Sequence, residues 1–389
     1  MFIFTLILLL YFPIYATNHD ILVAVLMVKN EAPVMCQTLQ PLVDAGIKSF
    51  FIFDTGSTDD TIETVERFFA EHSSCCYVIF SEQFIDFATS RNRALDLAES
   101  YFEQATFMVM LDAEWHLVNG AKLINFCHEH EHDKDAVYLM RIISGIDFYT
   151  SRLIRTKSGA RFSGAVHECI AASAKVPADV YFELKTTSYG RQKSKARWKR
   201  DALILEKEYE KNPSDSRTCF YLAQTYECLD DYESALFYYL KRLKLDGWDE
   251  ENFITRYRIA QLYEKLSYLN NDEQLWHHAQ HYYFDAYAYR PTRAEPLIKL
   301  AIAYRLKDLF YPAFLCAHKA ALMPYPSCDT LFVEKNLYEY YRYDVLGIVA
   351  WYCKEYNIGL WAVEKAIEKH PEYQHLHYNK QLYEKLIFN

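Results

Sequence analysis

The sequence predicts an α/β domain with a mostly parallel sheet, followed by an all-α domain of helical repeats. Apolar runs alternate with amphipathic helical stretches over residues 21–112, and small residues recur at helical spacing after residue 195. Glycine is scarce, with 10 in 389 residues, as expected for a helix-rich chain. The length is sufficient for two domains of ordinary size, each with its own core.

Four apolar runs predict the strands of the first domain. Each is short and continuous, which is typical of a strand buried on both faces of a parallel sheet. The runs are 21–28, 49–53, 77–80 and 106–111, and helical spacing lies between them at 34–46, 58–70 and 90–100. This alternation predicts an open, largely parallel sheet, in which ligands bind at the carboxyl ends of the strands.

Polar residues follow three of these strands, at Asn30, Asp54 and Asp112. The stretch DTGSTDD (54–60) joins a strand end to a helix N-terminus, which is a natural seat for a nucleotide. The stretch MLDAE (110–114) places two carboxylates two residues apart, and oxygen ligands suit Mn²⁺ or Mg²⁺. A structural reading of each stretch, as an ordinary acidic turn, stays open.

Two further stretches carry candidate site residues. In DFATSRNR (86–93), Arg91 lies near a helix start, where a guanidinium group could bind phosphate or form a surface ion pair. In RFSGAVHE (161–168), His167 is a candidate metal ligand and Glu168 a candidate acid or base, although such a pair is more often structural.

The second half of the chain repeats a pattern typical of tetratricopeptide-like helix pairs. Leu-Ala-x-x-Tyr at 222–226 recurs as Ile-Ala-x-x-Tyr from residue 259, as Leu-Ala-x-x-Tyr from 300 and as Leu-Gly from 346, each followed by a small residue in a second helix. Pro291, Pro324 and Pro371 close the last three units. Such pairs bury their faces only against neighbours and form a curved stack, in which we expect most of the tyrosines to pack in the core.

Charge and terminal composition limit the function further. The net charge of −10 makes nucleic acid an unsuitable partner. The apolar run at residues 1–17 predicts a signal peptide or a membrane anchor, and hence the secretory lumen or a membrane, with the cytoplasm as the alternative if the run is not a signal. Ten scattered cysteines show no zinc spacing and are expected to be mainly free thiols.

Together, the motifs resemble those of the family 2 glycosyltransferases, especially the subgroup that carries tetratricopeptide repeats. The matching stretches, in family order, are MVKNE (27–31), 54–60, DFATSRN (86–92), LDAE (111–114) and GAVHE (164–168). The resemblance implies a Rossmann-like GT-A catalytic domain at 18–190 and a repeat domain at 191–389. It also implies metal-assisted, inverting transfer of a sugar from UDP-sugar or another nucleoside-diphosphate sugar to a glycan or polypeptide acceptor.

The resemblance also implies a role for each site residue. Asn30, Glu31, Asp54, Asp59 and Arg91 would bind the nucleotide, and Asp112, Glu114 and His167 would hold Mn²⁺ or Mg²⁺. Asp112 and Glu168 would be catalytic, with Glu168 as the general base.

One departure from the family pattern keeps a second function open. Trp115 stands where the family has a further acidic residue. The alternative is a catalytically degenerate scaffold whose repeats bind a protein partner.

Overall fold

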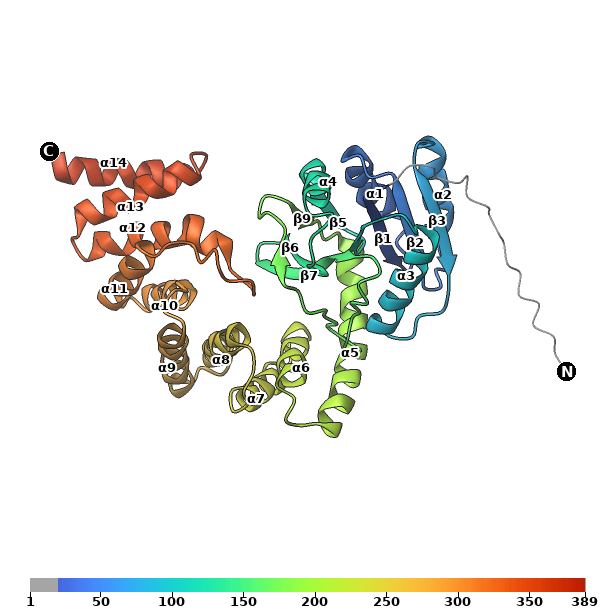
Figure 1. Ribbon diagram of the computed structural model, residues 1–389. Helices are drawn as coiled ribbons and strands as arrows, with labels where there is room; N and C mark the ends of the chain where they lie inside the picture. Colours follow the sequence, from blue (N-terminus) through green and yellow to red (C-terminus); the bar gives the residue numbers. More distant parts are fainter. Residues whose placement is uncertain (1–19, 389) are drawn as a thin grey trace. The chain divides into compact units, whose positions relative to one another are not determined.

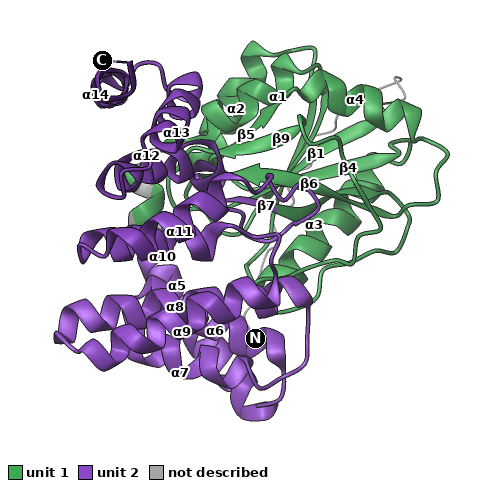
Figure 2. Ribbon diagram, turned by 90° about the vertical axis from the view of Figure 1, so that its left-hand side faces the viewer, with its two compact units in different colours: residues 1–144, 149–191 green, residues 145–148, 192–389 purple. Residues whose placement is uncertain are grey.

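The computed structural model describes residues 20–388, apart from the side chains at 189, 192 and 193. Within them the chain forms two compact units (Figures 1 and 2). Unit 1 comprises residues 20–144 and 149–191, and unit 2 comprises residues 145–148 and 192–388. The predicted signal or anchor at residues 1–17 lies outside the described residues.

Unit 1 contains one nine-stranded sheet with the strand order β3-β2-β1-β4-β7-β6-β9-β5, in which β8 also pairs with β6. Its strands are β1 (Leu22–Val28), β2 (Ser49–Asp54), β3 (Cys76–Ser81), β4 (Phe107–Leu111), β5 (Trp115–Val118), β6 (Val137–Ile143), β7 (Asp147–Arg155), β8 (Ala174–Lys175) and β9 (Tyr181–Leu184). Its helices are α1 (Met35–Asp44), α2 (Thr61–Glu71), α3 (Phe87–Tyr101) and α4 (Gly120–Glu129).

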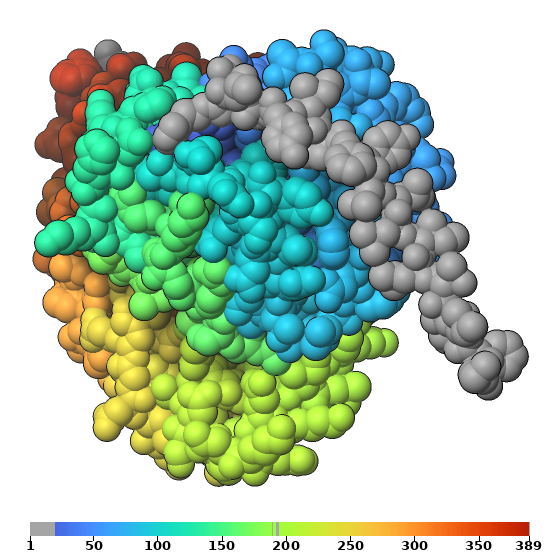
Figure 3. All heavy atoms as spheres, turned by 45° about the vertical axis from the view of Figure 1, so that its right-hand side comes forward, coloured from blue at the N-terminus to red at the C-terminus, as the bar shows by residue number. Residues whose placement is uncertain are grey.

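Helices cover both faces of the first strands, which explains their continuous apolar sequence. Val23 and Val25 of β1 lie in one buried cluster with Leu95 of α3. From the other face of β2, the ring of Phe50 lies 4.9 Å from that of Phe69 in α2. The outer sides of α2 and α3 are seen at the molecular surface in Figure 3 (blue to cyan).

The predicted fold class, a GT-A-like domain with a mostly parallel sheet followed by a solenoid, is wrong. Helices α1–α14 dominate the described chain, and the sheet is mixed. Parallel pairing joins β3, β2, β1 and β4, but β4 pairs antiparallel with β7, and β5 pairs antiparallel with β9. The prediction ended at residue 111 and therefore missed five of the nine strands, although one of them, β6, begins with the apolar run VYLM.

Unit 2 is a stack of helix pairs. Helix α5 (Ser188–Lys211) crosses the boundary between the units. The pairs are α6 (Ser216–Cys228) with α7 (Tyr232–Arg242), α8 (Asp249–Asn270) with α9 (Glu273–Tyr289), α10 (Glu295–Leu306) with α11 (Phe310–Ala321), and α12 (Arg342–Tyr352) with α13 (Tyr356–Lys369), followed by α14 (Gln374–Phe388). A π-helical turn, η1 (Leu337–Tyr341), leads into α12.

The small residues of the predicted repeats lie where the helices of each pair meet. Ala223 and Ala235 are fully buried in the first pair, as are their counterparts in the next two pairs. The fourth pair has Gly347 and Gly359 at the corresponding places, both buried. Small side chains let the helix backbones approach closely, so the repeat pattern is realised as packing. The fully buried large side chains include Tyr239, Tyr257, Tyr283, Tyr338 and Tyr383, whereas Tyr268, Tyr311, Tyr352 and Tyr378 are more than half exposed, so the expected packing role holds for part of the tyrosines.

We expect Gly359→Ala to destabilise the last repeat. A methyl group at this position would overlap the ring of Tyr383, which is buried and donates a hydrogen bond to the Gly347 carbonyl at 2.6 Å. Overpacking of this kind costs about 1–3 kcal/mol. Urea unfolding measures the loss, and Asn357→Ala, at an exposed position of the same helix, serves as the control. Equal stability of the two variants would show that the contact is not tight.

The ten cysteines are all free. Burial raises the pKa of the Cys127 thiol to about 12, whereas Cys36 is exposed. Because the thiolate is the reactive form, at pH 8 only about one Cys127 thiol in 10⁴ is ionised. We therefore expect iodoacetamide to modify Cys36 at least 100-fold faster than Cys127 in the native chain, as followed by mass spectrometry. Equal rates before unfolding would contradict the burial of Cys127.

None of the helices within residues 20–388 combines the length and the apolar character that crossing a bilayer requires.

Candidate functional site

Two loops of unit 1 are joined by a network that contains the predicted residues Asn30 and Asp54. The main-chain N–H of Asn30 donates to the Ser57 hydroxyl at 2.9 Å, and the side-chain Oδ1 of Asn30 accepts from the N–H of Thr58 at 2.7 Å. The Asp54 carboxylate accepts from the N–H of Ser57 at 3.0 Å. These polar side chains therefore hold the loops after β1 and β2 against each other.

The other two predicted loop residues, Glu31 and Asp59, belong to the same network. The N–H of Glu31 donates to the Thr61 hydroxyl at 2.8 Å. Asp59 accepts from the N–H groups of Ala32 at 3.3 Å and Thr61 at 3.1 Å. The structure thus brings together four of the five residues predicted to bind a nucleotide, and nucleotide binding itself stays a prediction.

The fifth, Arg91, lies in a buried ion-pair cluster with two predicted catalytic residues. Its Nη2 donates to Asp112 Oδ1 and its Nε to Glu168 Oε1, each at 2.6 Å. The Arg91 side chain is 4% exposed and that of Glu168 is 8% exposed. Burial disfavours the charged guanidinium, but the two carboxylates outweigh this effect and raise the pKa of Arg91. The cluster therefore depends on Arg91 for its charge balance.

A second guanidinium group, Arg152 of β7, completes the cluster. Its Nη2 lies 3.5 Å from Asp112 Oδ2, and its Cζ lies 4.7 Å from the ring centroid of Trp115. Its Nε and Nη1 atoms are buried and have no hydrogen-bond partner among the described residues. Burial, followed by the like charge of Arg91, lowers the pKa of Arg152 to about 10. Two cations and two carboxylates thus largely neutralise one another.

The three residues predicted to bind metal do not lie together in one cluster of the described residues. Asp112 faces the two arginines, whereas Glu114 accepts hydrogen bonds from the N–H and hydroxyl of Thr187 at 2.8 and 2.5 Å. His167 is exposed, in a left-handed conformation with φ 53°, within a loop that main-chain bonds between Ser163 and Cys169 close. Among residues 20–388 no group of three or more His, Cys, Asp or Glu could hold an ion. The Mn²⁺ or Mg²⁺ site and the general-base role of Glu168 stay predictions.

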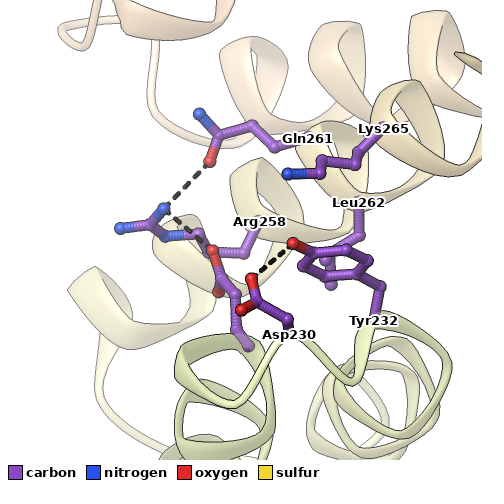
Figure 4. A pocket seen from close by; sticks show the side chains of 7 residues that line it. Asp230, Tyr232, Arg258, Gln261, Leu262 and Lys265 are labelled. Carbon is purple, nitrogen blue, oxygen red and sulfur yellow. Dashed lines mark hydrogen bonds and ion pairs between the residues drawn. The ribbon is translucent and has the colours of Figure 1, made fainter. Parts of the chain in front are cut away.

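Unit 2 carries an open pocket of about 330 Å³ that the motifs did not indicate. It lies between the first and second helix pairs, and its lining residues are Glu227, Asp230, Tyr232, Arg258, Gln261, Leu262 and Lys265 (Figure 4).

Paired charges organise this pocket, which we call the α6–α8 pocket. Arg258 Nη1 lies 3.2 Å from Glu227 Oε1 and from Gln261 Oε1. Burial opposes the charge of Arg258, but Glu227 raises its pKa. On the other side, Lys265 Nζ lies 4.6 Å from the centroid of the Tyr232 ring. Figure 4 shows these two side chains near each other. The pocket therefore offers donors, acceptors and an aromatic face within a small volume.

Apolar side chains continue the same surface along α8. Tyr268 and Leu269 are 52% and 63% exposed, and they follow Lys265 by three and four residues. Residues at this spacing share one face of a helix, so the pocket and the apolar side chains are neighbours. The signal in the sequence was the row Arg258, Gln261 and Lys265 at helical spacing, which is indistinguishable from an ordinary solvated face without the tertiary fold.

Comparisons with known proteins give a limited result. No protein-family model and no curated protein matches the chain. Among solved structures, MamA is 16% identical with a TM-score of 0.35 and covers 48% of this chain and 97% of its own. TTC0263 of Thermus thermophilus, a tetratricopeptide repeat (TPR) protein, is 15% identical, with a TM-score of 0.32 and coverage of 50% and 93%. YrrB, described as a TPR protein with an unusual peptide-binding site, is 15% identical, with a TM-score of 0.36 and coverage of 49% and 86%.

These findings correct the assignment made from motifs. The expected membership of the family 2 glycosyltransferases is wrong, because no family model matches and the structures found are tetratricopeptide repeat proteins. The assignments as an enzyme and as a metal-binding glycosyltransferase fall with it. Five short motifs in family order did not suffice, because acidic turns after strands are common in α/β sheets whatever their function.

Proposed function

We propose that this protein is a scaffold whose helical repeats bind a polypeptide partner. The observation that carries the proposal is the α6–α8 pocket, which two successive helix pairs build and which an exposed apolar surface extends. Partner sites commonly combine aromatic and apolar anchors with a polar rim. Charges of both signs line this pocket, so it suits the mixed donors and acceptors of a peptide better than a strongly charged ligand.

The pocket and the apolar side chains beside it would bind different groups of the partner. A polar side chain or a main-chain group of the partner enters the pocket and meets Arg258, Gln261 and Lys265. An adjacent apolar side chain of the partner lies against Tyr268 and Leu269, where it covers surface that is otherwise exposed to water.

Selection of peptides displayed on phage against the full chain tests this proposal. We expect selected peptides to bind the chain saturably in fluorescence anisotropy, and Lys265→Glu and Leu269→Asp each to weaken binding at least tenfold. Such losses are typical of residues at the centre of an interface. Lys369→Glu, at an exposed position of α13 outside the pocket, is the matched control and should bind like the wild type. Equal binding by all three variants, or no selected peptide at all, would contradict the proposal.

A further inference from the structure

A stretch of the chain itself is held on the helices of unit 2 in the manner of a bound peptide. Between α11 and η1 the chain makes a long loop, residues 322–336, which leaves the helix stack in Figure 1 (orange). Residues 329–333 of this loop (DTLFV), which we call the inner segment, contact α8 and Arg293 before α10, and Val333 also pairs through its main chain with Asp147 at the start of β7.

Two side chains recognise the main chain of the inner segment. The carboxylate of Glu250 in α8 accepts from the N–H groups of Thr330 at 2.7 Å and Leu331 at 2.6 Å. Arg293, before α10, donates to the carbonyl groups of Leu331 at 3.2 Å and Phe332 at 2.9 Å. Main-chain bonds of this kind give affinity for a polypeptide with little dependence on its sequence.

Side chains add sequence preference at alternate positions. Asp329 accepts two hydrogen bonds from Arg290, both at 2.8 Å, and one from Arg293 at 3.1 Å. Leu331 and Val333 are 5% and 2% exposed. The inner segment therefore presents an acidic residue followed, two and four positions later, by buried apolar residues.

One receiving side chain, Arg293, is also held by residues outside the inner segment, whereas the hydrogen bonds of Glu250 go to Thr330 and Leu331 of the segment itself. Glu295 accepts from Arg293 Nε at 2.9 Å and from the Tyr338 hydroxyl at 2.5 Å, and both Arg293 and Glu295 are fully buried. By contrast, Phe332 has a φ of 48°, which a bulky residue rarely adopts, so its conformation is imposed by its surroundings. Arg293 is therefore positioned in part by Glu295, and the inner segment adopts a strained conformation where it meets Arg293.

We propose that α8 and the start of α10 form a second polypeptide-binding site, which the inner segment closes in the free protein. The ligand is a partner segment with an acidic residue followed at alternate positions by two apolar residues, which competes with residues 329–333. This inference rests on the scaffold role proposed above. It concerns other residues than the α6–α8 pocket, so an experiment can contradict either site without contradicting the other.

The test is rebinding of the segment as a free peptide. In the full chain, residues 327–334 are replaced by a Gly-Ser linker of equal length, and a fluorescent peptide covering residues 326–336 is added. We expect this variant to bind the peptide saturably and the wild type at least tenfold more weakly. A peptide methylated on the Leu331 nitrogen loses the N–H that Leu331 donates to Glu250, and one with Asp329→Ala cannot pair with Arg290 and Arg293. Each should lose at least tenfold in affinity.

Binding of the methylated peptide as tightly as the parent would overturn the proposal, as would no binding by a linker variant whose helical circular dichroism is native. Equal binding by the wild type would show that the segment does not close the site. If the linker variant does not fold, the variant Thr330→Pro is used instead, since it removes both the N–H and the hydroxyl that Thr330 donates to Glu250. It should bind the free peptide more tightly than the wild type, and an unchanged affinity would contradict the proposal.

Discussion

Arg293→Met lowers the free energy of unfolding of unit 2 by about 3–5 kcal/mol, because it leaves buried carboxylates without their partner. Arg293 is fully buried and pairs with Glu295 at 2.7 Å and with Asp329 at 3.1 Å. Methionine fills a similar volume but supplies no charge and no donor. The main-chain carbonyl groups of Leu331 and Phe332 would also each lose the hydrogen bond that Arg293 donates.

The loss should depend on pH in a defined direction. Burial alone would raise the pKa of Asp329, but Arg290 and Arg293 hold it below its ordinary value of 3.8. Because the folded-state pKa is lowered, this contribution is present above about pH 4 and is lost as pH falls through the lower folded value. The difference in free energy of unfolding between the wild type and Arg293→Met should therefore become smaller below pH 4.

Urea unfolding followed by circular dichroism measures this effect. Lys335→Met is the control, because its ion pair with Glu339 is 3.3 Å long and the two side chains are 36% and 42% exposed. Such a pair contributes at most about 1 kcal/mol. Equal losses from the two variants would mean that the buried cluster around Arg293 does not form.

Arg91→Met should be nearly as damaging to unit 1, at about 3–5 kcal/mol, for the same reason. It removes the hydrogen-bonded partner of Asp112 and of Glu168, and the side chain of Glu168 is 8% exposed. It also removes the like charge that helps to lower the pKa of Arg152. One guanidinium group would remain for two carboxylates, so the strands that carry the cluster should open more readily.

Hydrogen exchange of the β1 and β4 peptides, read by mass spectrometry, isolates this effect from the unfolding of unit 2. Arg93→Met provides a control in the same helix, α3, since its pair with Glu82 is 2.9 Å long but the side chains are 47% and 41% exposed. We expect faster exchange in Arg91→Met and little change in Arg93→Met. Equal exchange rates in the two variants would contradict a stabilising role of the ion-pair cluster around Arg91.

Parts of the fold were predictable because local sequence and burial agree there. The run at 21–28 is buried on both faces as β1, and the run at 106–111 becomes β4. Strand β5 could not be predicted in the same way. It has four residues, its burial alternates, and its partner β9 lies more than 60 residues further along the chain. Such pairings depend on tertiary context and not on local propensity.

The candidate sites show the same division. Glycine and alanine at the helix contacts, such as Gly359 and Ala235, identified the repeats because close packing leaves no choice of residue. The roles of Glu250 and Arg293 could not be predicted, because charged residues near a helix start are common in sequences. They bind the main chain of the inner segment only because a loop distant in sequence folds against them. Motif order suggested a function that the comparisons contradict.

The most direct test of the central claim, that unit 2 binds a polypeptide partner, is hydrogen exchange of the full chain with and without a selected peptide. The account predicts slower exchange at residues 227–232 and 258–269, and loss of this protection in Lys265→Glu. Protection confined to residues 20–144, or protection that persists unchanged in Lys265→Glu, would contradict it.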